Sequence, residues 1–398
     1  MTVPSRVLPA LVLAQLAGTS PWFAVNAVMP DLQLAYGWPA AAVGTLTSAV
    51  QGGFIVGTLV FALLAVADRF SARRVFLLCA LASAGCSLAA VASVQALGAQ
   101  SFAALWGWRA ATGFFLAGIY PVGMKIAAQW FPQGLGPALG LLIGALVLGT
   151  ASPHALRAVG AAWPWAWVFV GVAAASVAGG LLVVAGIPEP AARPQGRGAG
   201  VHLRDLASLW TDRRVRASVF GYFGHMWELY TMMVMVPAIL ATRLTGAALS
   251  WGAFAVIGVG AIGCAGGGAL VRHFGSARVA GVQLTASGLC CLLAPLLLQA
   301  PDALFWAWLL VWGVTVAGDS PQFSALTAAN APRQSVGSVL TLTNCLGFGI
   351  SIVSIQLFSA WAQTVPLAQL LPWLAVGPAL GVLALRPLLA RAGPAQGR

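Results

Sequence analysis

The sequence predicts an all-α membrane protein in which twelve transmembrane helices form two six-helix halves. Hydrophobic residues make up 60% of the 398 positions and charged residues only 7%, whereas a soluble domain carries about 25% charged residues. Apolar runs recur at lengths near the roughly 20 residues that cross a bilayer. Basic residues fall almost entirely in alternate loops, which is typical of membrane proteins.

Six apolar runs precede one long polar segment and six follow it. We expect spans at 8–29, 40–66, 75–95, 102–128, 138–156 and 165–187, and then at 217–242, 247–270, 279–299, 303–327, 335–359 and 367–388. Each run is bounded by charged residues or by Pro- and Gly-rich breaks, where a spanning helix ends.

The basic residues predict the sidedness of the chain. If both termini are cytoplasmic, sixteen of the 20 Lys and Arg residues face the cytoplasm, and only Arg157 and Arg243 face the other side. The remaining two, Arg109 and Lys125, lie in the fourth span, and Lys125 is expected to snorkel towards the lipid headgroups. We therefore expect a multi-pass protein of the bacterial inner membrane with both termini in the cytoplasm.

The long polar segment divides the chain into an N-terminal bundle (1–187), a cytoplasmic linker (188–216) and a C-terminal bundle (217–398). The first part of the linker contains Pro and Gly, which is typical of a flexible connection. In its second part, Leu203, Leu206 and Leu209 share one helical face. This spacing predicts a short amphipathic helix on the cytoplasmic membrane surface.

The loops after the second and eighth spans resemble each other. Phe70 matches Phe274 and Arg74 matches Arg278, each pair 204 residues apart. A weak internal repeat of this kind indicates two related halves, as in many transporters.

The loop after the second span also resembles a family motif, G-x-x-x-D-R-x-G-R-R. Asp68, Arg69 and Arg73 match its charged positions and Arg74 follows just beyond, although both glycine positions hold other residues. In the fourth span, Arg109 begins a partial match to R-x-x-x-G-x-G. By these motifs and its six-plus-six arrangement, the chain resembles the major facilitator superfamily over essentially its whole length.

The resemblance implies a transporter in which the two halves alternate access to a central cavity. It implies that the first, fourth, seventh and tenth spans line this cavity. It also implies a gating role for Asp68, Arg69, Arg73 and Arg74, whose loop helps to close the cytoplasmic side in the family. We expect Asp68 to be ionised and hydrogen-bonded among the neighbouring guanidinium groups. The fifth span lacks the Gly-Pro signature of drug antiporters.

Three ionisable residues lie clearly inside spans, namely Arg109, Glu228 and Asp319. A charge near the bilayer centre costs roughly 3 kcal/mol or more, so each one indicates a functional site by default. Arg109 suits either an anionic group or an acid that holds its helix. Asp319, close to the helix-kinking Pro321, suits a proton or solute site, or the neutralisation of a basic residue in the other half.

The seventh span is the richest in polar and aromatic side chains. Tyr222 and His225 share a helical face, Glu228 flanks that face beside His225, and Tyr230 lies farther round. Burial favours the neutral form of a carboxyl group, and an imidazole exchanges protons near neutral pH. We therefore predict proton coupling by Glu228 and Asp319, although a structural contact between helices is the plain alternative.

Polar stripes on the first and eleventh spans complete the predicted site. Trp22 and Asn26 lie on the first stripe with Gln15 and Thr19, and Asn344 begins the second, which continues through Gly347, Ser351 and Ser354. The predicted substrate-binding residues are Asn26, Trp22, Arg109, Tyr222, His225, Tyr230 and Asn344.

Function follows from what the chain contains and lacks. It has no P-loop, HExxH, nucleophile elbow or dinucleotide fingerprint, so we expect no catalytic residues, cofactor or metal. The net charge of +12 belongs to the loops, so we expect no nucleic-acid partner. The six cysteines form no CxxC pair and are interpreted as small buried hydrophobes.

We predict a secondary transporter that works as a monomer in the lipid bilayer. Its partners are protons and a small solute, with an organic anion or zwitterion favoured because Arg109 accompanies two acids. A proton-driven exporter of hydrophobic drugs is the alternative, ahead of a membrane enzyme or a sensor that transports nothing.

Overall fold

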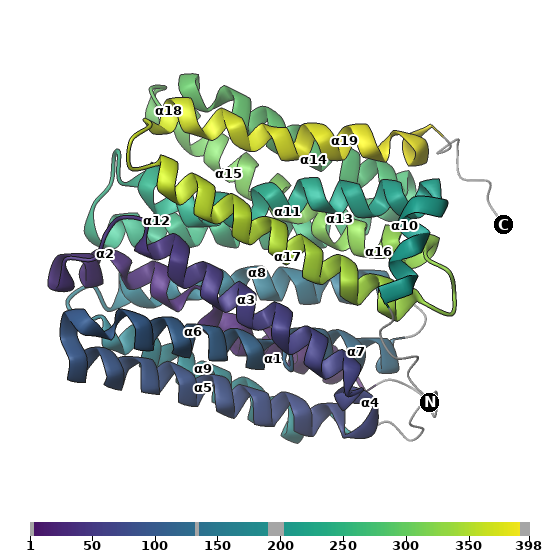
Figure 1. Ribbon diagram of the computed structural model, residues 1–398, viewed down its shortest axis with the longest axis horizontal. Coiled ribbons are helices and arrows are strands. Elements are labelled where there is room, and N and C mark those ends of the chain that lie inside the picture. Colours follow the sequence, from purple (N-terminus) through teal and green to yellow (C-terminus); the bar gives the residue numbers. More distant parts are fainter. Residues whose placement is uncertain (1–3, 132–134, 190–202, 391–398) are drawn as a thin grey trace. The chain divides into compact units, whose positions relative to one another are not determined.

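The computed structural model describes residues 4–131, 135–189 and 203–390 (Figure 1). Every regular element in these ranges is helical. Ten helical stretches are long and apolar enough to cross a membrane. One of them, Ala72–Trp130, has 59 residues and holds two crossings. The helix α11 (Arg213–Leu240), which begins with arginines and carries Glu228, adds a further crossing. The predicted fold of twelve transmembrane helices is therefore confirmed.

The chain forms two compact units. The first contains Met1–Gly198 and Val236–Gly258, and the second contains Ala199–Met235 and Val259–Arg398. The boundary thus runs through α11 and places the segment 236–258 with the first unit, rather than with the rest of the C-terminal bundle. The division predicted from the sequence, at 187 and 217, stays a prediction.

The first unit contains the N-terminal helices together with one helix from the second half of the chain. Its elements are α1 (Val7–Thr19), η1 (Ser20–Phe23), α2 (Ala24–Tyr36), α3 (Ala42–Leu63), α4 (Val66–Arg69), α5 (Ala72–Leu97), η2 (Gly98–Ser101), α6 (Phe102–Leu116), α7 (Tyr120–Trp130), α8 (Leu135–Val159), α9 (Ala166–Gly186) and α12 (Gly246–Gly258). The helix α1 packs on α8 and α9, α5 packs on α6 and α9, and α12 packs on α8 (Figure 1).

Glycines let α3 and α6 approach very closely. A Cβ atom on Gly53 would lie 1.8 Å from the carbonyl oxygen of Ala110, and one on Gly113 would lie 1.9 Å from that of Val50. Two helix backbones touch in this way only where small residues face each other, as is common in membranes. This contact fixes α6, which carries Arg109, against α3.

The second unit contains the site residues of the C-terminal half. Its elements are η3 (Leu203–Ala207), α10 (Ser208–Thr211), α11 up to Met235, α13 (Gly260–Phe274), α14 (Ser276–Leu297), α15 (Asp302–Gly318), α16 (Ser320–Asn330), α17 (Val336–Trp361), α18 (Leu367–Leu370), η4 (Leu371–Ala375) and α19 (Val376–Leu389). The helix α14 packs on α15 and α19, and α13 packs on α15. The predicted amphipathic segment corresponds to η3 and α10, where Leu209 is buried against Val215 and Val219 of α11; His202, at its start, lies outside the described residues.

The fourth and tenth spans are both interrupted, and at matching places. The fourth is divided into α6 and α7 with Pro121 at the start of α7, and the tenth into α15 and α16 with Pro321 at the start of α16. Gly118 and Gly318 precede these prolines by three residues. The two breaks are thus 200 residues apart in sequence, which extends the internal repeat from the loops into the spans. A proline cannot donate the backbone hydrogen bond of a helix interior, so each break follows from its sequence.

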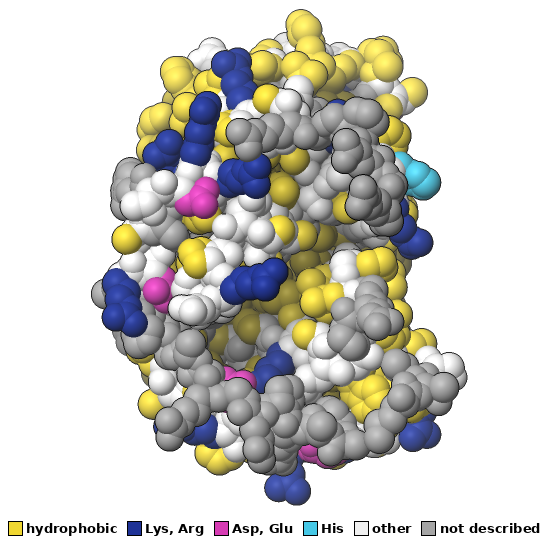
Figure 2. All heavy atoms as spheres, turned by 90° about the vertical axis from the view of Figure 1, so that its right-hand side faces the viewer, with side chains coloured by type: hydrophobic (Ala, Val, Ile, Leu, Met, Phe, Trp, Pro, Cys, Tyr) yellow, Lys and Arg dark blue, Asp and Glu magenta, His cyan; other side chains and the backbone are white. Residues whose placement is uncertain are grey.

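Lys and Arg side chains lie at the surface in the view of Figure 2, together with a few acidic ones. The assignment of the basic loops to the cytoplasm stays a prediction from the loop charges.

Candidate functional site

Glu228 lies in the interior of the second unit with hydrogen-bond donors from two other helices. Its side chain is fully buried. Trp312 of α15 donates its indole N–H to Oε1 at 2.6 Å, and Cys291 of α14 donates to the same oxygen at 3.1 Å. Ser287 of α14 donates to Oε2 at 2.8 Å. Both oxygens of this buried carboxyl group therefore have hydrogen-bond donors, as buried polar groups normally do.

His225 and Asp319 form a second ionisable contact. The Nδ1 atom of His225 lies 2.8 Å from Oδ1 of Asp319, and both side chains are almost completely buried. Asp319 occupies the break between α15 and α16, and His225 precedes Glu228 by three residues on α11. The structure therefore brings together the three ionisable residues that the sequence predicted for this half, and the basic partner of Asp319, His225, lies in its own unit.

The other face of α11 packs against α17. Tyr222 donates its hydroxyl to Oδ1 of Asn344 at 2.7 Å. The Ser354 hydroxyl donates to the carbonyl of Trp227 at 2.6 Å. The ring centre of Tyr230 lies 5.3 Å from that of Phe348. The polar stripe of the eleventh span thus faces a neighbouring helix, which matches the plainer interpretation of such stripes as contacts between helices.

Arg109 holds the interrupted first span. It is fully buried, and it donates Nη1 to the carbonyl of Pro21 at 2.9 Å and Nη2 to the carbonyl of Trp22. These carbonyls belong to η1, the turn that separates α1 from α2. The hypothesis that an acid holds Arg109 is wrong for the described residues, because its contacts there are backbone carbonyls rather than a carboxylate.

Trp22 and Asn26 are buried in contacts with α3. The Trp22 ring centre lies 4.9 Å from that of Phe54. Asn26 donates from Nδ2 to the Thr47 hydroxyl at 3.0 Å. Both contacts lie within the first unit, so the structure explains the burial of these two residues without a solute.

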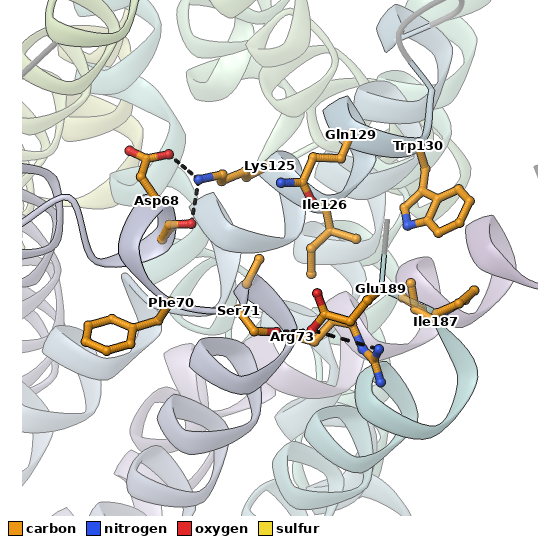
Figure 3. Close-up of a pocket in the computed structure, with 13 residues that line it drawn as sticks. Asp68, Phe70, Ser71, Arg73, Lys125, Ile126, Gln129, Trp130, Ile187 and Glu189 are labelled. Carbon is orange, nitrogen blue, oxygen red and sulfur yellow. Dashed lines mark hydrogen bonds and ion pairs between the residues drawn. The ribbon is translucent and has the colours of Figure 1, made fainter. Parts of the chain in front are cut away.

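Two ion pairs surround a pocket at the end of the first unit (Figure 3). Asp68 pairs with Lys125 of α7, which also donates to the carbonyl of Ala67 at 2.5 Å. Arg73 donates to the carbonyl of Val184, and its Nη1 lies 4.0 Å from Glu189. The expectation that Asp68 pairs with arginines of its own loop is therefore wrong. The ammonium group of Lys125 thus reaches a carboxylate and a carbonyl at the end of α4, and the expectation that it snorkels towards the headgroups stays a prediction.

The sequence interpretation missed several partners. Ser287 and Cys291 lie four residues apart, on one face of α14. Neither carries a charge that would mark it in the sequence as a site residue. Trp312 precedes Asp319 by seven residues, a spacing that returns to the same helical face and signals a common partner helix. Cys291 is buried, as the sequence predicted, but it also serves as a donor to Glu228.

The membrane-spanning helices and the buried ionisable groups define a polytopic carrier protein rather than an enzyme. The profile of the Major Facilitator Superfamily matches residues 11–355. The chain belongs to this family.

Solved structures show the same fold. The human organic anion transporter MFSD10 (TETRAN) superposes with a TM-score of 0.72 at 15% identity, covering 96% of this chain and 100% of that one. The proton:xylose symporter XylE, bound to 6-bromo-6-deoxy-D-glucose, gives 0.74 at 12% identity over 99% and 96% of the two chains. A partially occluded inward-open form of XylE from E. coli gives 0.76 at 12% identity over 99% and 98%. No curated protein sequence matches.

Proposed function

We propose that the chain is a proton-coupled secondary transporter in which Glu228 and the His225–Asp319 pair bind and release the coupling proton. One observation carries this proposal: three ionisable side chains are buried together inside membrane spans, at the break of the tenth span. Such groups are costly in a bilayer and mark proton relays in pumps and transporters. The break between α15 and α16, where Asp319 lies, is a point where the tenth span can change its direction.

The favoured solute is a small organic anion or a zwitterion. Arg109 provides a fixed positive charge and the second unit provides the acids. Both terminal nitrogens of Arg109 are engaged by the carbonyls of Pro21 and Trp22. A bound anion would therefore have to exchange with these carbonyls, so Arg109 holds the first span in one step and contacts solute in another. The structural neighbours share 12–15% identity, and they support the fold rather than the solute.

In this proposal, transport proceeds by alternating access of the two halves. The protein works as a monomer in the inner membrane, with both termini in the cytoplasm. The Asp68 loop, with Arg69, Arg73 and Arg74, takes part in closing the cytoplasmic side. The Asp68–Lys125 pair supports this role because it ties the loop to α7 within one unit. The loop then moves as one piece with the fourth span.

Reconstituted proteoliposomes test the proposal. A panel of labelled organic anions and zwitterions is offered with and without an imposed proton gradient, and internal pH is followed with a trapped dye. We expect one class to accumulate chemically unchanged and proton movement to accompany it. Accumulation without proton movement would overturn the coupling, and gradient-driven export of hydrophobic dyes alone would favour the drug exporter.

The variant Glu228→Gln separates coupling from binding. It should abolish gradient-driven accumulation and spare solute exchange, which needs no net proton release. Unchanged accumulation in Glu228→Gln together with its loss in Asp319→Asn would transfer the coupling role to Asp319. Unchanged accumulation in both variants would exclude both residues.

A further inference from the structure

Two apolar grooves run along the exposed face of α14 in the second unit. The first has a volume of about 750 Å³ and the second of about 680 Å³. Both are lined by Thr285, Leu289 and Val382, so together they form one continuous surface, the α14 groove, between helices α14 and α19 that pack side by side (Figure 1). Volumes of this size are typical of sites that hold a small organic molecule.

The groove follows from small residues of α14 where α19 packs on it. A Cβ atom on Gly281 would lie 3.3 Å from the side chain of Leu389, and one on Gly288 would lie 2.9 Å from that of Pro378. The two helices therefore approach closely over two turns, while Phe274 of α13 lines the groove from the other side. The surface is thus built by three helices rather than by the bare face of one.

Two arginines lie at one end of the α14 groove. Arg278, in the first turn of α14, lines the groove and is exposed. Arg386 of α19 is also exposed, and it lies four residues after Val382 and three before Leu389, on the helical face that lines the groove. Neither guanidinium forms an ion pair within the described residues, and no acidic residue of that part of the chain lines the groove. The end of the groove is therefore positively charged.

Beyond the arginines, the groove is apolar over a length that suits a lipid tail. Leu292 follows Arg278 by 14 residues and lines the far part of the groove. This distance corresponds to about 21 Å of helix at 1.5 Å per residue, whereas the hydrocarbon of one leaflet is roughly 15 Å thick. Leu289 and Leu292 are 52% and 56% exposed, so the apolar path is open to the bilayer.

We propose that the α14 groove binds an anionic phospholipid, with its phosphate on Arg278 and Arg386 and an acyl chain along α14 towards Leu292. A guanidinium binds phosphate through paired N–H donors, and the apolar path beyond it has no use for a soluble anion. A second copy of the chain fits less well. Copies in one membrane share their orientation, so a symmetric contact through this surface would bring the two basic ends together.

The lipid site lies behind the helix that contacts Glu228. Ser287 and Cys291, which donate to Glu228, are buried, whereas Thr285 and Leu289, two residues earlier in each case, are exposed and line the groove. Successive residues of a helix are about 100° apart, so the two pairs point to nearly opposite sides of α14. Lipid binding can therefore be measured without changing any residue of the proposed transport site.

Native mass spectrometry tests the charged end. The full chain is equilibrated with equal amounts of phosphatidylglycerol and phosphatidylcholine with identical acyl chains, and the retained lipids are counted. We expect phosphatidylglycerol to be favoured about tenfold or more, and Arg278→Gln to lower its retention about fivefold. Arg272→Gln is the control, because Arg272 is an exposed arginine of the adjoining turn of α13 that does not line the groove. No preference for phosphatidylglycerol, or equal losses in both variants, would overturn the proposal.

Thr285→Trp tests the apolar part while both arginines stay in place. Thr285 is exposed and lines both parts of the groove, so an indole there fills the groove without entering the core. Retention of phosphatidylglycerol should fall to about the level of Arg278→Gln. Val353→Trp, on the exposed face of α17, should retain lipid like the wild type. Melting temperatures show whether each variant is folded, and wild-type retention in a folded Thr285→Trp would overturn the acyl-chain site.

Two further outcomes of the same measurement identify other occupants. An excess of glycerol 3-phosphate, which carries the phosphate without acyl chains, should leave the retained lipid in place; its displacement would assign the arginines to a soluble anion and overturn the proposal. The recorded masses also show the oligomeric state. A dimer in the wild type that dissociates in Thr285→Trp would assign the groove to a second copy and overturn the proposal as well.

Discussion

The indole nitrogen of Trp312 lies 2.6 Å from Oε1 of Glu228, whereas that of Trp308, one turn earlier on α15, donates to the backbone carbonyl of Cys290 at 2.9 Å. The two rings are stacked with their centres 5.4 Å apart. Two tryptophans of equal size on one helix thus differ in what they bind, which makes them a matched pair for mutation.

Replacing Trp312 by Phe should impair proton-coupled accumulation more than replacing Trp308. A hydrogen bond to a charged group contributes about 1.5–3 kcal/mol, and a neutral one about 1 kcal/mol. Since 1.4 kcal/mol is about a tenfold effect, we expect Trp312→Phe to lower gradient-driven accumulation at least tenfold, with Trp308→Phe changing mainly the melting temperature. Equal effects on accumulation would show that the bond to Glu228 is not used in coupling.

Asp68 and Lys125 should act as one unit. Because their side chains are partly exposed, the pair contributes only about 0–1 kcal/mol, which still alters the balance between two access states of similar free energy. We expect Asp68→Asn and Lys125→Met each to slow transport and to shift cysteine accessibility towards the inward-open state. The double variant should be no slower than either single one, and Lys125→Arg should retain activity. Additive slowing would mean that the two residues act separately.

Arg109 should matter for stability as well as for transport. Loss of its guanidinium leaves the carbonyls of Pro21 and Trp22 without these donors, at a cost of about 1–3 kcal/mol for each buried group. Arg109→Met should therefore lower the melting temperature by several degrees. Arg109→Lys should recover only part of the loss, because an ammonium group lacks the planar fork of a guanidinium. A wild-type melting temperature in Arg109→Met, with transport lost, would make Arg109 a solute contact alone.

Close packing between α3 and α6 predicts that the effect of a Gly→Ala substitution in α6 on stability depends strongly on which glycine is replaced. Gly113→Ala places a Cβ atom 1.9 Å from the Val50 carbonyl oxygen, whereas Gly107 on the same helix has open space around it. Overpacking typically costs about 1–3 kcal/mol, so Gly113→Ala should melt well below the wild type. Gly107→Ala should melt at or above it. A similar melting temperature for both variants would contradict the packing described for the first unit.

The sequence predicted the fold well because the decisive signals are local. Span length, loop charge and the presence of an acid within a span can each be seen without knowing what packs on what. The positions of Glu228, Asp319 and His225 were identified for this reason, and the structure brings His225 and Asp319 to 2.8 Å.

The partners of these residues could not be identified in the same way. Periodicity tells which face of a helix is polar, but not which neighbouring helix meets that face. Asp68 therefore was expected to bind arginines close in sequence, while the structure gives it Lys125, 57 residues away. Ser287 and Trp312 carry no charge that would draw attention, and they become site residues only because α14 and α15 pack against Glu228.

The paired breaks at Gly118–Pro121 and Gly318–Pro321 show that bending and titration are specified by different residues. Ile119 occupies the place in the fourth span that Asp319 occupies in the tenth, and both spans are interrupted there. The helix break therefore does not depend on Asp319. Glycine and proline already specify the break, and the acid is present in only one of the two spans. Selection or design can consequently exchange the ionisable group at this point, and with it the ion proposed to drive transport, while the helix break itself stays as it is.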